Sequence, residues 1–195
     1  MADDALLVAK GSVFQPCGRG RLAAAGAPGK KGVAKWVAAG CTAVVSLQRD
    51  DEFQPGDGSV AAQCLRAGIT WLHLPLTGRG AVGRERTAAD SASLARVGEV
   101  ASLLSPAAAD AAGASVVVHC SAGMHRTGMV CYLALRLCGR SIDEALATLV
   151  AMRKVTHDEV VARHSSTYFD RSESTSIADL AEEFYQTTLL PTKAL

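Results

Sequence analysis

The chain has 195 residues, 49% of them hydrophobic, and this length and composition suit one globular domain with a complete core. A formal net charge of +1 provides no bulk attraction to nucleic acid or to an anionic membrane, so neither partner is expected. No apolar stretch reaches the roughly 20 residues of a membrane-spanning helix, and the acidic start at Asp3 and Asp4 is unlike a signal peptide.

Hydrophobic periodicity, interrupted by glycine and proline, predicts strands that alternate with helices. The expected strands are 5–9, 12–14, 42–47, 69–74 and 116–118. The expected helices are 31–39, 60–67, 87–113 with a break at Pro106, 127–137, 142–153 and 177–190. The expected loops are 17–33 with at most a brief strand near Leu22, 49–59, 77–86, and a Ser/Thr-rich connection at 165–176.

This alternation predicts an α/β fold, with one domain over residues 1–195 and a mostly parallel central sheet that has helices on both faces. In such sheets the ligand site lies beyond the carboxyl end of a strand. Residues 115–128 occupy that position and read Ser-Val-Val-Val-His-Cys-Ser-Ala-Gly-Met-His-Arg-Thr-Gly.

The chemistry of this segment follows from its two ends. A β-branched run ends at Cys120, and Arg126 opens an apolar helical stretch. A helix N-terminus with converging backbone N–H groups binds anions and also favours a cysteine thiolate. The planar guanidinium of arginine matches two phosphate oxygens. The loop can therefore bind a phosphate group and attack it.

The segment from His119 to Thr127 resembles the signature of the cysteine-dependent protein tyrosine phosphatases, His-Cys-x-x-Gly-x-x-Arg-Ser/Thr. The order of elements around it is similar to that of the compact dual-specificity phosphatases. Three short strings are also similar to the cyclin-dependent-kinase-associated phosphatases. They are Ala27-Pro28-Gly29, Gly40-Cys41-Thr42 and His73-Leu74-Pro75-Leu76.

The resemblance implies a role for each matching residue. Cys120 would be the nucleophile that forms a phosphocysteine, and Thr127 would hydrogen-bond its sulfur and ease its departure. His119 would support the thiolate through hydrogen bonds, and Gly123 would permit the loop's backbone geometry. The phosphate oxygens would be held by Ser121, Ala122, Gly123, Met124, His125 and Arg126.

The resemblance also implies the reaction and its surroundings. The expected substrate is a phosphorylated protein, and phosphate, sulfate or vanadate would bind in the active site without a metal or cofactor. Six cysteines lack the spacing of a zinc site and the density of a disulfide framework. Together with a catalytic thiolate, which needs a reducing compartment, they place the protein in the cytoplasm.

The general acid is the main departure from the family pattern. Related enzymes place an aspartate on a loop before the cysteine, and here Gly78 aligns with it. Asp90, Glu85 and, later in the chain, Asp158 remain candidates, and the acid could also be absent. Proton donation to the leaving group is typically worth about 10²–10⁴-fold. Without it the enzyme would favour phenolic leaving groups over alkoxides.

Several alternatives stay open on the sequence alone. Arg79, Arg84 and Arg86 are either solvated loop charges or a basic rim for an anionic substrate. Cys131 and Cys138 are expected to pack in the helix core, but Cys131 or Cys64 could resolve an oxidised Cys120 as a disulfide if folding brings it close. The alternative functions are a phosphatase of RNA 5′-phosphate, inositol phosphate or lipid, and a pseudophosphatase that binds phosphate without turnover.

Overall fold

The computed structural model describes residues 7–29, 31–53, 59–78, 86–108, 110–162 and 175–190. Their strands form a five-stranded sheet in the order β1-β2-β5-β3-β4, antiparallel between β1 and β2 and parallel elsewhere. The strands are β1 Gln15–Cys17, β2 Gly20–Ala25, β3 Ala43–Ser46, β4 Thr70–His73 and β5 Ser115–His119. The predicted mostly parallel α/β sheet is confirmed.

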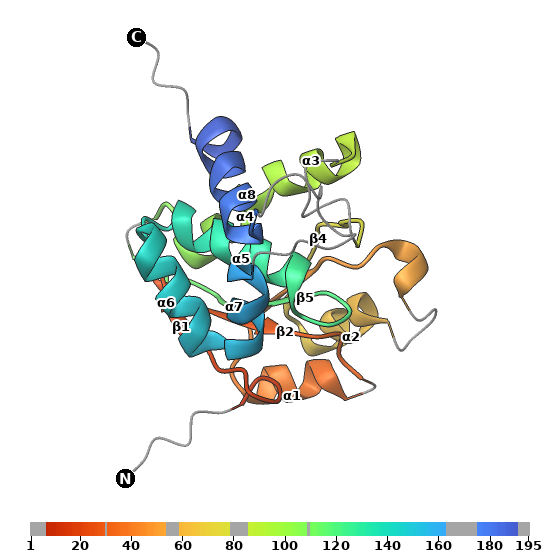
Figure 1. Cartoon of the computed structure of the whole chain (residues 1–195). Coiled ribbons are helices and arrows are strands. Elements are labelled where there is room, and N and C mark those ends of the chain that lie inside the picture. The colour runs from red at the N-terminus through yellow and green to blue at the C-terminus, as the bar shows by residue number, and fades with distance from the viewer. Residues whose placement is uncertain are drawn as a thin grey trace.

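Helices cover both faces of this sheet (Figure 1). They are α1 Gly32–Ala38, α2 Val60–Ala67, α3 Ala88–Ala95, α4 Val97–Leu104, α5 His125–Leu137, α6 Ile142–Met152, α7 Lys154–Val161 and α8 Ile177–Phe184. A 3₁₀ turn, η1 Asp50–Glu52, follows β3, and a π-helical turn, η3 Tyr185–Leu189, continues α8. One core cluster lies under α1 and α2, and the larger one lies under α4 to α8.

Strand β5 is the centre of the molecule because every one of its residues is buried. Its side chains alternate, so that Val116 and Val118 join the larger cluster while Val117 joins the smaller one. Continuous β-branched residues are typical of a strand covered on both faces. The strand therefore carries Cys120, which follows it directly, to a fixed place at the edge of the sheet.

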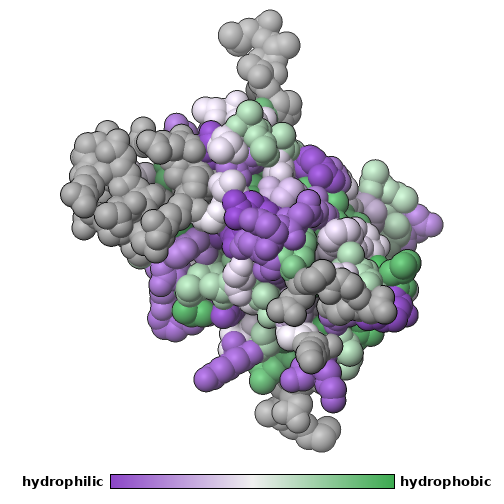
Figure 2. All heavy atoms as spheres, turned by 90° about the vertical axis from the view of Figure 1, so that its right-hand side faces the viewer, coloured by the Kyte–Doolittle hydropathy of each residue, from purple (hydrophilic) through white to green (hydrophobic). Residues whose placement is uncertain are grey.

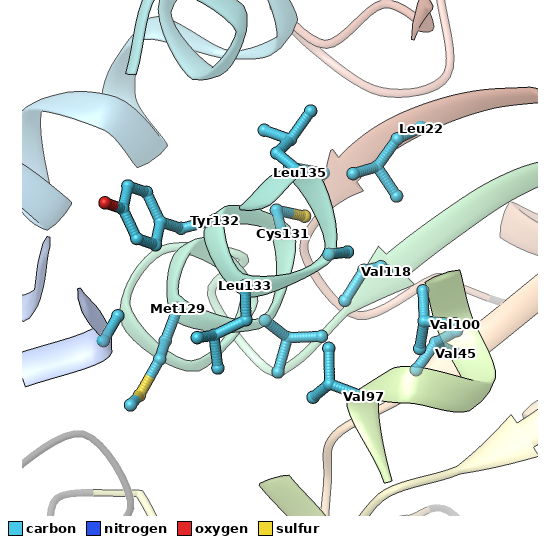
Figure 3. Close-up of a cluster of buried hydrophobic side chains, with 14 of the residues drawn as sticks. Leu22, Val45, Val97, Val100, Val118, Met129, Cys131, Tyr132, Leu133 and Leu135 are labelled. Atoms are coloured by element: carbon cyan, nitrogen blue, oxygen red, sulfur yellow. The ribbon is translucent and has the colours of Figure 1, made fainter. Parts of the chain in front are cut away.

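Helix α5 is buried on nearly all sides, as expected for a helix that is apolar around its circumference. Figure 3 shows its side chains directed toward both the sheet and the neighbouring helices, with Leu133 near Val97 of α4. Gly128 is required for one of these contacts, because a Cβ there would lie 2.2 Å from Val160 Cγ2 of α7. This close packing fixes the helix whose first turn holds Arg126.

The C-terminal helix packs on the domain through a polar contact with α5. The carboxylate of Glu182 accepts hydrogen bonds from Tyr132 Oη at 2.8 Å and from Arg136 Nε and Nη2 at 2.8 and 2.9 Å. Arg86 also lies against this helix, with its guanidinium 4.9 Å from the ring centre of Phe184. Arg86, one of the three arginines of the predicted basic rim, therefore stacks on Phe184 of α8.

Several expectations about the elements differ from the structure. Of the predicted strands 5–9 and 12–14, the described residues form only an isolated bridge between Ala9 and Ser12. The brief strand expected near Leu22 is β2, which spans six residues beside β5, and its small residues at Ala23–Ala25 fit the crowded sheet without β-branched side chains. The helix predicted over 87–113 is divided at Arg96, and α4 ends at Leu104, before Pro106, with no helix among the described residues from there to 113. Helix α7 was not predicted, since its residues are mostly polar. Glu85, Arg79 and Arg84, and most of the 165–176 connection, lie outside the described residues.

Candidate active site

The signature segment forms a loop between β5 and the first turn of α5. His119 pairs with Ala25 of β2 and with Ser46 of β3, so the loops that follow these three parallel strands meet at one edge of the sheet. This edge, which includes the turn η1, lies on the right-hand side of Figure 1. Figure 2 looks onto that side and shows hydrophilic side chains gathered near its centre.

Gly123 closes the loop around the sulfur of Cys120. Its backbone N–H donates a hydrogen bond to Cys120 Sγ, with the two atoms 3.2 Å apart. Its φ is +72°, and a Cβ at this position would lie 2.3 Å from the backbone of Ala25. Both the left-handed conformation and the close approach require glycine. The fixed glycine of the motif thus aims a donor at the thiol.

The loop carbonyls are held from outside by neighbouring elements. The Ser121 carbonyl accepts a hydrogen bond from the Ala27 N–H at 3.0 Å. Thr156 Oγ1 donates to the Gly123 carbonyl at 2.7 Å, and Arg153 Nη1 donates to the same oxygen. These bonds fix the loop backbone, so its anion site does not depend on a ligand for its shape.

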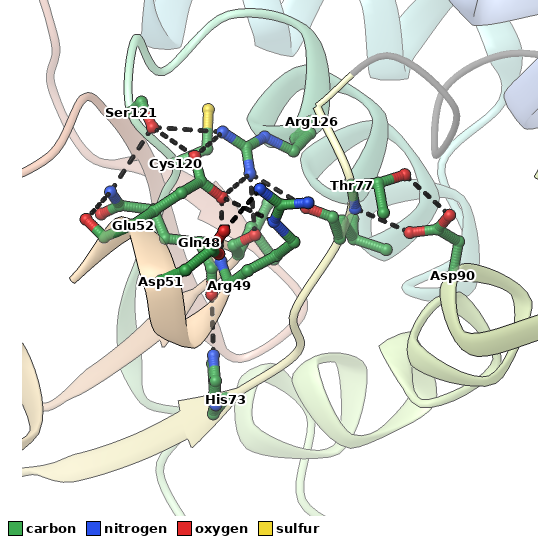
Figure 4. Close-up of polar contacts among 12 residues, drawn as sticks. Gln48, Arg49, Asp51, Glu52, His73, Thr77, Asp90, Cys120, Ser121 and Arg126 are labelled. Carbon is green, nitrogen blue, oxygen red and sulfur yellow. Dashed lines mark hydrogen bonds and ion pairs between the residues drawn. The ribbon is translucent and has the colours of Figure 1, made fainter. Parts of the chain in front are cut away.

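Arg126 lies beside Cys120 and is buried, with 8% of its side chain exposed. Its Nη1 donates to the Leu76 carbonyl at 2.9 Å and to Glu52 Oε2 at 2.7 Å, and its Nη2 donates to Glu52 Oε1 at 2.8 Å (Figure 4). Nη2 also lies 3.2 Å from Ser121 Oγ. The guanidinium is therefore held by groups from three loops, and it is oriented before substrate binds.

Glu52 is the site residue that sequence reasoning missed. Besides Arg126, its carboxylate accepts hydrogen bonds from Ser121 Oγ and from the Arg49 N–H, both at 2.9 Å. The hydrogen bonds from Arg126 lower the pKa of Glu52 to about 2. Glu52 is thus ionised at neutral pH and acts as the counter-charge of Arg126, which keeps that guanidinium in place.

His119 is fully buried at the end of β5 and is neutral in the folded protein. Trp71 Nε1 donates to Ser46 Oγ at 2.9 Å, so the Ser46 hydroxyl proton is available for His119 Nε2, 2.7 Å away. Burial lowers the pKa of His119 to about 4. The ring of Trp36 lies on its other side, 5.4 Å away between ring centres. These contacts fix the residue that precedes Cys120.

The hydrogen-bond partners of Thr127 and Asp90 differ from those that their expected roles require. Thr127 Oγ1 is buried without a hydrogen-bond partner, so it makes no hydrogen bond to the sulfur of Cys120 in this structure. The Asp90 carboxylate is buried and accepts hydrogen bonds from the backbone N–H and hydroxyl of both Thr77 and Thr87, at 2.7–3.2 Å. Figure 4 shows Thr77 between Asp90 and Arg126.

The remaining candidates lie farther from the reacting centre. His125 Nε2 contacts Glu159 Oε2 at 2.9 Å, and Asp158 is exposed and contacts His157 Nδ1 at 3.2 Å. Cys131 shares the larger core cluster with Cys120 and is fully buried. Cys64 belongs to the smaller cluster on the opposite face of the sheet. Folding therefore brings only the first of the two candidate resolving thiols to the side of Cys120.

The described residues contain neither a candidate metal site nor a candidate membrane span. No group of three or more His, Cys, Asp or Glu side chains among them could hold a metal ion. None of the helices in the described ranges has the length and apolar character needed to cross a bilayer.

Comparisons with known proteins place the chain in a family and show which solved structures share its fold. A family model for the tyrosine phosphatase family matches residues 21–190. Kinase associated phosphatase, with its catalytic-site cysteine replaced by serine, superposes with a TM-score of 0.57 at 12% identity, over 93% of this chain and 98% of that one. The core catalytic domain of the PP-IP phosphatase SIW14 from S. cerevisiae, in complex with citrate, gives 0.50 at 14% identity, over 90% and 84%. These likenesses show the fold alone. No curated protein matches the chain.

Proposed function

The chain belongs to the tyrosine phosphatase family, and we propose that it hydrolyses phosphomonoesters on proteins through a phosphocysteine intermediate formed on Cys120. One observation carries this proposal. Cys120 lies at the carboxyl end of the central strand, receives a hydrogen bond from the Gly123 N–H, and has the oriented guanidinium of Arg126 beside it. The phosphatase works in a reducing, cytoplasmic compartment, where its thiol stays free.

In the first step the Cys120 thiolate attacks phosphorus. The S–P bond forms as the P–O bond to the leaving group breaks, and the leaving oxygen takes a proton from solvent. Arg126 and the N–H groups of the loop from Ser121 to Arg126 stabilise the charge on the three equatorial oxygens. Because Glu52 and the Leu76 carbonyl already orient Arg126, little reorganisation is needed at the moment of reaction.

In the second step a water molecule attacks the phosphocysteine. The S–P bond breaks, inorganic phosphate leaves and the Cys120 thiolate is restored. Thr127 begins next to Arg126 in the first turn of α5, and its buried Oγ1 has no other partner. We propose that this hydroxyl turns toward the sulfur when the thiolate departs, which would satisfy both groups.

Asp90 is better suited to positioning than to proton donation. Although burial acts to raise its pKa, the hydrogen bonds from Thr77 and Thr87 lower it, so the carboxylate holds its charge and has no proton to give. By joining Thr77 to the first turn of α3, Asp90 fixes the segment whose Leu76 carbonyl holds Arg126. Phenolic phosphates are therefore the expected best substrates, in line with phosphotyrosine.

The test is the hydrolysis of para-nitrophenyl phosphate by the wild type, by Cys120→Ser and by a matched control, Cys138→Ser. Cys138 is half-buried at the far end of α5. We expect Cys120→Ser to lose all turnover while it still binds vanadate, and Cys138→Ser to retain wild-type turnover. Turnover by Cys120→Ser that is comparable to the wild type would contradict the proposal. A wild type that binds vanadate without turnover would identify a pseudophosphatase.

A further inference from the structure

A cavity of about 300 Å³ lies beside the phosphate loop, on its β2 side. The chain start, the turn after β2, the helix α1 and one residue before α7 enclose it. Its lining residues include Lys10, Gly26, Pro28, Lys35 and Arg153. The volume is at the lower end of the range of about 300–1,000 Å³ typical of small-molecule sites.

The charge of this cavity is of one sign. Lys10, Lys35 and Arg153 contribute three cations, and none of the described lining residues is acidic. Lys10 and Lys35 are exposed, and neither has a hydrogen-bond or ion-pair partner among the described residues. Arg153 also keeps its buried Nε without a partner. The whole chain is nearly neutral, with a net charge of +1. Three cations around one cavity, with no acidic partner among the described residues, therefore indicate an anionic ligand.

The cavity shares a wall with the phosphate loop. Arg153, which lines the cavity, donates a hydrogen bond from its Nη1 to the Ala122 carbonyl of the loop at 3.3 Å. Gly26 lies so close to the loop that a Cβ there would be 3.2 Å from the Ser121 carbonyl oxygen. The residues that line the cavity are therefore in direct contact with the loop that carries Cys120.

We propose that this cavity is a second phosphate subsite, which binds a further phosphate group of the same substrate molecule whose first phosphate lies at Cys120. The inference rests on the proposed function and narrows its substrate to a class that carries at least two phosphates. Lys10 and Lys35 bind the second group as mobile point charges, and Arg153 binds it from the shared wall. Pro28 supplies apolar surface for the carbon atoms between the phosphates.

The test compares two inhibitors of para-nitrophenyl phosphate hydrolysis at constant ionic strength. Inositol hexakisphosphate offers linked phosphates, whereas inorganic phosphate offers one. The variants are Lys10→Met/Lys35→Met and a control, Lys31→Met, which changes an exposed lysine next to α1 that does not line the cavity. We expect the double variant to weaken hexakisphosphate inhibition by about tenfold, with inorganic phosphate inhibition and basal turnover unchanged. Lys31→Met should behave as wild type.

The outcomes distinguish a linked subsite from a bulk charge effect and from a separate ion site. If hexakisphosphate inhibition weakens equally in the double variant and in Lys31→Met, the effect comes from bulk charge and the proposal is overturned. The proposal is also overturned if inhibition weakens in neither variant. A non-competitive component of inorganic phosphate inhibition that disappears in the double variant would also overturn it, because the cavity would then bind a separate ion. If the wild type does not hydrolyse para-nitrophenyl phosphate, the proposed function fails. Calorimetric titration of hexakisphosphate then still tests the cavity, because binding that is equal in wild type and double variant would overturn the subsite.

Discussion

Replacing Glu52 by glutamine removes the charge that holds Arg126 and preserves the length of the side chain. The ion pair is mostly buried, with 8% of the Arg126 side chain and 23% of the Glu52 side chain exposed. The pKa of Glu52 falls from its ordinary 4.5 to about 2 on folding, first of all because of Arg126. At 1.36 kcal/mol for each pH unit, this difference corresponds to about 3 kcal/mol.

Two consequences are expected for Glu52→Gln. The free energy of unfolding at neutral pH falls by about 3 kcal/mol, near the lower end of the 3–5 kcal/mol typical when one partner of a buried pair is removed. The Leu76 carbonyl and Ser121 Oγ still hold Arg126, but less firmly. Misplacement of a catalytic group by about 1 Å can cost about 10²-fold in rate, so kcat/KM for para-nitrophenyl phosphate should fall by about that factor.

The measurements are urea denaturation and steady-state hydrolysis of wild type, Glu52→Gln and Asp51→Asn. Asp51 is the matched control, since it is the adjacent acid, 68% exposed, and pairs with Arg49 at the surface. It should change stability by less than about 0.5 kcal/mol. The role of Glu52 is refuted if Glu52→Gln keeps wild-type stability and kcat/KM, or if Asp51→Asn lowers both by as much as Glu52→Gln does.

The pH dependence of stability gives an independent check on Glu52. Its pKa is lower in the folded than in the unfolded chain, so the stability it contributes is present above about pH 4.5 and is lost as pH falls toward 2. Glu52→Gln should remove this part of the acid destabilisation. An unchanged slope between these pH values would contradict the ion pair.

Three further predictions concern residues around the site. Asp90→Asn should slow aryl and alkyl phosphate hydrolysis by the same factor, because Asp90 positions Thr77; a larger loss with the alkyl phosphate would identify it as the general acid. His119 has its pKa lowered from 6.5 to about 4, so the wild type should lose stability as pH falls through this window. Urea midpoints of His119→Gln should fall less, and equal slopes would contradict a buried neutral histidine. Glu182→Gln should lower the free energy of unfolding by about 1–3 kcal/mol. It should leave kcat/KM unchanged, since its partners Tyr132 and Arg136 lie on the side of α5 that meets α8. A matching loss of kcat/KM would show that the C-terminal helix affects the site.

The signature loop could be predicted from sequence because its determinants are local. Val116–Val118 indicate a buried strand, and the spacing from Cys120 to Arg126 fits one loop that ends in a helix. The structure agrees with both expectations. Gly123 also follows locally, since its positive φ and its contact with Ala25 explain why the motif has glycine there.

Glu52 could not be predicted because its partner is 74 residues away in the sequence. Its segment has the composition of a surface loop, and only the pairing of β3 with β5 brings it to Arg126. The sequence does show three acids, Asp50–Glu52, shortly after a predicted strand, but nothing in it singles out Glu52. The full extent of β2 beyond Leu22 was not predicted for a different reason, because Ala23–Ala25 carry no β-branched pattern.

The role of Asp90 depends equally on tertiary contacts. Its distance from Cys120 along the chain fits the position of a general acid in the family, and its place near a helix start also fits a capping residue. Only the contacts distinguish these roles. The hydroxyls and N–H groups of Thr77 and Thr87 occupy the carboxylate, a fact that no single-sequence pattern contains.

The central claim is that a phosphoryl group passes through Cys120, and trapping the intermediate tests it most directly. Wild-type protein mixed with para-nitrophenyl phosphate is quenched within one turnover, digested and examined by mass spectrometry. A phosphocysteine intermediate predicts one added phosphoryl group on the peptide that contains Cys120, and no added group on this peptide in Cys120→Ser. Turnover with no label on this peptide, or with the label on another residue, would contradict it.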